Sequence, residues 1–87
     1  MSKHTKLLLL VLAGRYDHNI DFDELCRLLI RLGFDQRIRG DHHIFSRAGI
    51  DEILNLQPKH GMAKPYQVKQ VRQLILEYKL GDLDAND

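Results

Sequence analysis

The segment Arg37–Phe45 constrains the fold most, because Gly40-Asp41 separates two short stretches with the character of β-strands. A two-residue loop that begins with glycine predicts a tight hairpin, of type II′, or of type I′ if both residues have positive φ. Such a loop fixes the register of the two strands. It pairs Arg39 with His42, Ile38 with His43, Arg37 with Ile44 and Gln36 with Phe45.

Alternation along the strands sorts these side chains onto two faces of the hairpin. The face expected to meet the core carries Phe34, Gln36, Ile38, His43 and Phe45. The other face carries Arg37, Arg39, His42, Ile44 and Ser46. His43 is therefore predicted to pack against apolar groups, and His42 to lie in solvent beside two guanidinium groups. An imidazole in that setting suits a phosphate ester, although most strand histidines are structural or simply exposed.

Two helices are predicted before the hairpin. The first covers residues 3–13 and ends at Gly14. It is apolar nearly all round, so it needs cover on more than one side, from other elements or from a partner chain. The second is capped by Asp21, with Glu24 three residues later. Its predicted inner stripe is Phe22, Leu25, Cys26, Leu29 and Ile30.

A third strand and a last helix are predicted after the hairpin. A loop at 47–51 leads into a strand at 52–56, which ends before Pro58. The last helix begins at Pro65. Its predicted inner residues are Val68, Val71, Leu74, Ile75 and Tyr78, and its outer residues are Lys69, Arg72 and Lys79. The order predicts an α+β fold in which a three-stranded antiparallel sheet has its helices on one face.

Length, charge and cysteine content limit the possible functions. A chain of 87 residues is expected to form a single domain, residues 1–87, with an acidic tail at 82–87 and a net charge of +1. One cysteine, Cys26, excludes an intrachain disulfide and favours the cytoplasm. The apolar run at 7–13 is too short to span a membrane. His42 and His43 point to opposite faces and cannot easily share one ion, so a metal site is not expected. No cofactor is expected.

Three motifs resemble those of the HicA family of toxin-antitoxin ribonucleases, over about residues 22–80. They are Leu32-Gly33-Phe34, Gly40-Asp41-His42-His43-Ile44-Phe45 and Pro58-Lys59-His60. The resemblance implies a double-stranded-RNA-binding-like αβββα core at 21–81, preceded by a helical extension at 1–20. Asp41 stands where the family commonly has serine or glycine, and the segment 61–65 departs from the family's usual pattern.

The same resemblance implies a toxin of a type II toxin-antitoxin system that cleaves mRNA without a metal. It makes His42 the catalytic histidine and implies a HicB-type antitoxin as partner. The residues expected to bind RNA are Arg37, Arg39, Lys59, His60 and Lys64. Two other functions remain open. One is a non-catalytic RNA-binding module that uses the same basic face, and the other is an interaction protein that docks through its apolar first helix.

Overall fold

The computed structural model describes residues 2–81, so the acidic segment predicted at 82–87 lies outside the described residues. The chain forms α1 (Lys3–Ala13), a 3₁₀ turn (Asp17–Asn19), α2 (Phe22–Arg31), β1 (Asp35–Arg39), β2 (His42–Arg47), β3 (Ile50–Leu56) and α3 (Pro65–Glu77). This order confirms the predicted α+β architecture, an αβββα core preceded by one helix.

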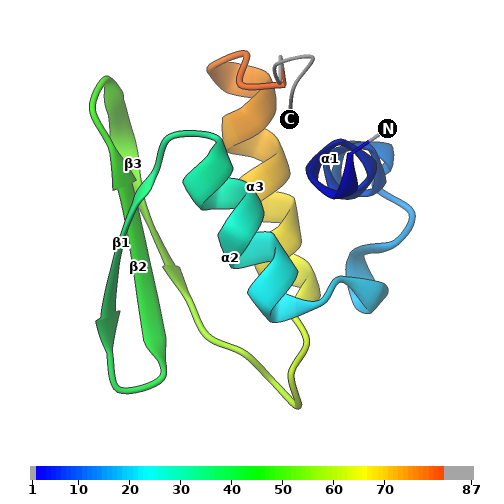
Figure 1. Ribbon diagram of the computed structural model, residues 1–87, viewed down its shortest axis with the longest axis horizontal. Helices are drawn as coiled ribbons and strands as arrows, with labels where there is room; N and C mark the ends of the chain where they lie inside the picture. The colour runs from blue at the N-terminus through cyan, green and yellow to red at the C-terminus, as the bar shows by residue number, and fades with distance from the viewer. Residues whose placement is uncertain (1, 82–87) are drawn as a thin grey trace.

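The elements form layers, with the sheet on one side, α2 and α3 behind it, and α1 beyond them (Figure 1). The inner face of the sheet contributes Phe45, Leu54 and Leu56 to a continuous core. The two helices that meet this face contribute Phe22, Leu25, Leu28, Leu29, Val68, Val71 and Ile75. Burial of this apolar surface is the main force that holds the sheet on the helices.

The first hairpin has the predicted register, with Arg39 opposite His42 and Ile38 opposite His43. Of the two loop residues, only Gly40 has a positive φ, 60°, which fits a type II′ turn. The sheet is antiparallel in the order β1-β2-β3. The structure therefore confirms both the predicted Gly40-Asp41 loop and the predicted register.

The third strand begins earlier than predicted. β3 starts at Ile50, which pairs with Arg47, so the predicted loop at 47–51 is a second two-residue hairpin through Ala48-Gly49. Gly49 has a φ of 87°, which the absence of a Cβ permits. Next to this hairpin, the register of the β2–β3 pairing shifts between Phe45 and Arg47, as at a β-bulge.

Helix α1 has the predicted bounds. The Ser2 hydroxyl accepts a hydrogen bond from the Thr5 N–H at 3.1 Å, and Gly14 ends the helix with a φ of 72°. The inner residues Leu7, Leu8 and Val11 are buried, and the helix packs against α2 and α3. Leu9 is 50% exposed on the outer side. One side of α1 is therefore covered by α2 and α3, and its other side is exposed to solvent.

Helix α2 begins as predicted, because the Asp21 carboxylate accepts the Glu24 N–H at 3.0 Å. The Glu24 side chain lies 3.0 Å from the Lys3 ammonium on α1, so it links the two helices. The prediction for Ile30 was wrong. Ile30 is 49% exposed and is the penultimate residue of α2.

Arg72 on α3 was predicted to face solvent, and this prediction was wrong. Its guanidinium donates to both carboxylate oxygens of Asp17, at 2.9 and 3.1 Å, and to the Val11 carbonyl at 3.1 Å. The side chains are only 16% and 18% exposed. A bidentate pair of this kind is directional as well as charged, so it fixes the end of α1 and the following turn on α3.

Gln67 is a buried polar residue of α3 that serves the segment after β3. With its amide oriented to satisfy both neighbours, it donates to the Gln57 carbonyl and accepts from the Gln57 N–H, each at 3.1 Å. Its side chain is 1% exposed, so these bonds satisfy groups that would otherwise be buried without partners. Gln67 therefore holds the end of β3 against α3.

Candidate functional site

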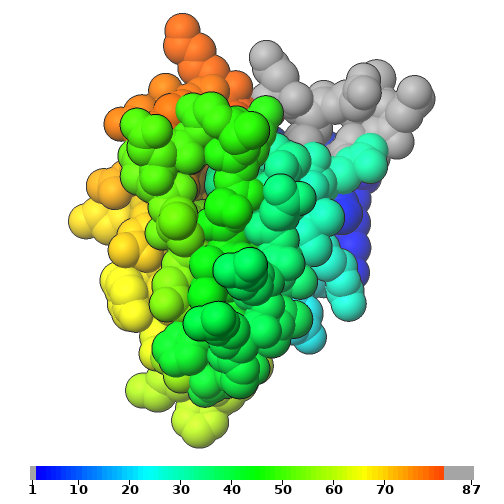
Figure 2. Space-filling model, turned by 90° about the vertical axis from the view of Figure 1, so that its left-hand side faces the viewer, coloured from blue at the N-terminus to red at the C-terminus, as the bar shows by residue number. Residues whose placement is uncertain are grey.

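The outer face of the sheet at the hairpin end forms the candidate site, and Figure 2 shows this face toward the viewer. His42 opens β2, directly opposite Arg39. Arg37 lies opposite Ile44, and strand alternation places it on the same face as Arg39 and His42. All three side chains are exposed. The predicted grouping of an imidazole with two guanidinium groups is therefore present.

The ring of His42 has a fixed neighbour on β3. Its Nδ1 atom lies 3.1 Å from Oδ1 of Asn55. An amide oxygen can only accept a hydrogen bond, so the contact is a hydrogen bond in the tautomer that carries its proton on Nδ1, and this tautomer leaves Nε2 for another partner. The sequence analysis did not identify Asn55. A polar residue between Leu54 and Leu56 does indicate an outward position, but the register of β3 was needed to place it next to His42.

Asp41 in the hairpin turn is tied to the end of β3. Its carboxylate accepts a hydrogen bond of 2.7 Å from the Gln57 side-chain amide. This bond is the main reason that the pKa of Asp41 lies below its usual value, and the charges of His42 and Lys64 add to it. The second Asp41 oxygen lies 4.0 Å from Nε2 of His42. Gln57 thus connects the Asp41 turn to the end of β3, and the Gln67 side chain of α3 binds the backbone of Gln57.

His43 points to the opposite face, as predicted. Its ring meets Phe22 edge-on, with 4.9 Å between the ring centroids and an angle of 80°. Its Nδ1 lies 3.3 Å from Oε1 of Gln36. The two adjacent histidines therefore have different surroundings. Gln36 and Ile38 were predicted on the core-facing side but are exposed, because β1 is an edge strand.

His60 and Gly61 form a two-residue turn within the predicted loop at 57–63, and Lys59 directly precedes it. Lys59 and Met62 exchange backbone hydrogen bonds of 2.9 and 3.0 Å, and His60 has a φ of 53°. This turn is bonded to the beginning of α2, through Phe22 N–H to the Gly61 carbonyl at 3.0 Å. The turn and the Gly40-Asp41 hairpin loop lie at the same end of the molecule (Figure 1). RNA binding by Lys59 and His60 stays a prediction.

Lys64 comes closer to the hairpin than its position in the sequence indicates. It precedes α3 with extended backbone angles and is half-buried. Its charge lowers the pKa of Asp41, which places the ammonium within electrostatic reach of the hairpin loop. Of the cations predicted after the sheet, Lys64 thus has the most direct link to the candidate site.

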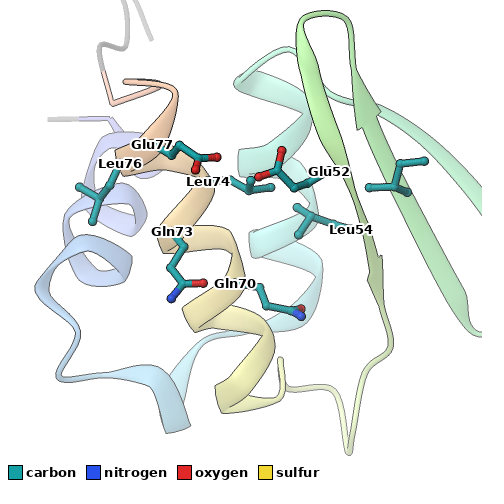
Figure 3. Close-up of a pocket in the computed structure, with 8 residues that line it drawn as sticks. Glu52, Leu54, Gln70, Gln73, Leu74, Leu76 and Glu77 are labelled. Atoms are coloured by element: carbon teal, nitrogen blue, oxygen red, sulfur yellow. The ribbon is translucent and has the colours of Figure 1, made fainter.

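A separate groove of about 560 Å³ lies between β3 and α3. Figure 3 shows the carboxylates of Glu52 and Glu77 turned toward one another across it. Glu52 accepts a hydrogen bond of 2.6 Å from the Tyr78 hydroxyl, and its pKa is lowered mainly for that reason. The hydrogen bond with Glu52 raises the pKa of Glu77. Two carboxylates repel a polyanion, so the groove differs in character from the His42 face.

Two further findings concern other classes of site. Within residues 2–81, His, Cys, Asp and Glu side chains form no group of three or more that could hold a metal ion. In the same part of the chain, no helix has the length and apolar character needed to cross a bilayer.

These features define a class of protein, a small α+β domain with an αβββα core and a cationic, histidine-bearing outer sheet face. Comparison with protein families gives a match to the HicA toxin of bacterial toxin-antitoxin systems over residues 22–77. The chain therefore belongs to the HicA toxin family. The match begins with α2 and leaves α1 outside it. No curated protein and no solved structure matches the chain.

Proposed function

We propose that this toxin is an endoribonuclease that cleaves mRNA without a metal ion, with His42 as its catalytic acid or base. The observation that carries the proposal is the position of His42 on the exposed sheet face. Asn55 orients its ring, and Arg39 lies directly opposite. An imidazole titrates near neutral pH and can therefore take up or release a proton under physiological conditions.

The reaction would be an attack by the ribose 2′-OH on the adjacent phosphorus. The 2′-O–P bond forms and the P–O5′ bond breaks, which leaves a 2′,3′-cyclic phosphate and a 5′-OH. Neutral His42 would take the 2′-OH proton at Nε2, or protonated His42 would give a proton to the O5′ leaving group. Arg37 and Arg39 would bind the phosphate and stabilise the charge that develops on it. Lys59, His60 and Lys64 would contact flanking phosphates.

Purified toxin incubated with RNA in EDTA tests this proposal. Cleavage is expected to continue in EDTA and to leave a cyclic or 3′-phosphate with a 5′-OH. A 2′-deoxy substitution at the cut site should stop it, because the nucleophile is then missing. A strict Mg²⁺ requirement or a 5′-phosphate product would refute His42 as the acid or base. Binding of RNA without cleavage would favour the non-catalytic RNA-binding module.

The second part of the proposal concerns the antitoxin. Membership of the family implies a toxin-antitoxin partner. We infer that the partner is of the HicB type and covers the face that carries Arg37, Arg39 and His42. An acidic segment on this face would form charge-assisted hydrogen bonds with the guanidinium groups. It would exclude RNA by occupying the same donors. The exposed side of α1, which includes Leu9, offers a second contact.

A further inference from the structure

A shallow hollow of about 360 Å³ lies on the outer face of the sheet, beyond His42 along β2. Its lining comes from all three strands and comprises Asp35, Gln36, Arg37, Ile44, Ser46 and Ile53. Ile53 is 66% exposed, more than any other large hydrophobic residue among those the structure describes. Single exposed apolar side chains are common on protein surfaces, but apolar side chains that line the same hollow together mark a candidate binding site. Ile44 and Ile53 therefore form an apolar patch that is available to a ligand.

The charges on this face change along its length. Arg37, Arg39 and His42 occupy the hairpin end, and Asp35 lies opposite Ser46 at the other end. Phosphates are attracted to the hairpin end and repelled by Asp35. A ligand that spans both ends therefore needs an anionic part beside the arginines and a neutral part over the isoleucines. The neutral part should be flat and apolar on its face, and it should carry N–H donors on its edge for the Asp35 carboxylate.

A single-stranded nucleotide meets these requirements. Ile44 follows His42 by two residues, roughly 7 Å along the strand, a separation similar to one nucleotide of an extended RNA. Unpaired bases in RNA commonly lie on protein side chains and are read along their hydrogen-bonding edges. The base next to a phosphate held by Arg37 and Arg39 would therefore reach Ile44 and Ile53.

The Asp35 carboxylate would also discriminate between bases. Guanine presents two adjacent N–H donors, N1–H and N2–H, which match the two oxygens of a carboxylate. Adenine and cytosine place a ring acceptor beside their single amino group, and uracil flanks one N–H with two carbonyls. Each of these would set an acceptor against an Asp35 oxygen, which leaves polar groups unpaired. Guanine is therefore the best match to Asp35.

We propose that the hollow over Ile44 and Ile53 is a base-selective subsite, which binds a guanine next to the scissile phosphate of single-stranded RNA. In this subsite the base lies on the two isoleucines, and Asp35 accepts its N1–H and N2–H. The inference rests on the proposed function and adds a specificity to it. Asp35 reads the base, while Arg37 and Arg39 bind the neighbouring phosphates.

Binding to short labelled RNAs tests the subsite without cleavage if the full-length His42→Ala variant is used. Uridine oligomers that contain a single guanosine are expected to bind about tenfold more tightly than those with adenosine or cytidine. Asp35→Asn should abolish this preference, and Ile53→Ala should weaken binding of all the oligomers. Asp23→Asn on α2 is the matched control, because it removes a carboxylate from an exposed position outside the hollow. This control should retain the preference.

Equal binding of all oligomers, or a preference that persists in Asp35→Asn, would overturn the subsite. Loss of antitoxin binding in Ile53→Asp, with RNA binding unchanged, would assign the hollow to the protein partner and would overturn it as well. The proposed function fails separately, if wild-type protein with unmodified RNA gives no cleavage. A preference for guanosine that depends on Asp35 could survive that failure as a property of an RNA-binding module.

Discussion

The imidazole of His42 and the side-chain amide of Asn55 lie on adjacent strands, with 3.1 Å between Nδ1 and Oδ1. The contact crosses the second hairpin, so the orientation of the ring depends on the register of β3. It directs Nε2 away from Asn55, to the atom position at which a proton would be exchanged with RNA. Asn55 is therefore expected to act as a positioning residue.

Asn55→Ala should lower kcat for RNA cleavage about tenfold with little change in KM, because the ring loses its fixed orientation. The free energy of unfolding should change by less than about 0.5 kcal/mol, since the side chain is exposed. Long-range ¹⁵N–¹H NMR would report the tautomer of His42. Asn55→Asp, which retains an acceptor oxygen, should preserve that tautomer. Full activity and an unchanged tautomer in Asn55→Ala would exclude the positioning role.

His42→Ala should reduce cleavage about a hundredfold or more, because it removes the acid or base. The same change should relieve growth arrest on overexpression and leave the fold intact. His43→Ala should chiefly lower the free energy of unfolding, by about 1 kcal/mol, since it removes the ring contact with Phe22. Urea unfolding and cleavage assays on both variants separate the two roles. If His43→Ala were inactive but fully stable, while His42→Ala remained active, the assignment of catalysis to His42 would be wrong.

Replacement of Arg37 and Arg39 by glutamate should weaken both RNA binding and the antitoxin complex. The two ligands are expected to use the same guanidinium groups, and reversed charges repel an anionic partner. Anisotropy with RNA and co-purification with the co-expressed antitoxin measure the two effects. If RNA binding is lost while the complex is unchanged, the antitoxin must bind elsewhere, and the exposed side of α1 becomes the main candidate.

Gln67→Leu should lower the free energy of unfolding by about 1–3 kcal/mol, because the N–H and carbonyl of Gln57 would then lack their buried partners. Urea denaturation measures this change. Gln70→Leu is the matched control, since Gln70 is exposed on the same helix, and it should change stability by less than about 0.5 kcal/mol. Equal effects of the two substitutions would show that the Gln57 contact contributes nothing.

The raised pKa values of Cys26 and Tyr78 lead us to expect that the protein becomes less stable at alkaline pH. Burial raises the pKa of Cys26 to about 12, and the bond to Glu52 raises the pKa of Tyr78 to about 12. Unfolded chains ionise these groups near about 8.5 and 10, so the folded state binds more protons above those values. Stability should therefore decline above about pH 8.5. In Cys26→Ala, the loss of stability should begin only near about pH 10. In Tyr78→Phe, the further loss of stability above about pH 10 should be absent. Unfolding midpoints that stay constant from pH 8 to 11 would contradict both assignments.

The sequence predicted those parts of the fold that local rules determine. Gly40-Asp41 sets the first hairpin register, Gly14 ends α1, and Asp21 begins α2. In each case the conformation depends on one or two residues and their immediate neighbours. The same reasoning separated His42 from His43, because alternation along a strand needs no knowledge of the rest of the chain.

The remaining features depend on contacts between distant segments. Ala48-Gly49 was interpreted as part of a longer loop with one permissive glycine, and the pairing of Arg47 with Ile50 that makes it a tight hairpin depends on the register of β3. The partner of Arg72 is Asp17, and nothing in α3 alone indicates a carboxylate from the start of the chain. Asn55 reaches His42 only through the pairing of β2 with β3. The catalytic role of His42 and the RNA-binding residues still rest on the proposal.

The bond between Gln67 and the backbone of Gln57 also implies an order of events during synthesis. A ribosome releases the N-terminal part of a chain first, so the His42 hairpin can emerge and close while α3 is still inside the exit tunnel. Gln57, which holds the Asp41 turn, gains its own anchor only after Gln67 has emerged. The surface around His42 is thus complete only after Gln67 has been synthesised. An antitoxin already present in the cell could meet that surface almost as soon as it exists.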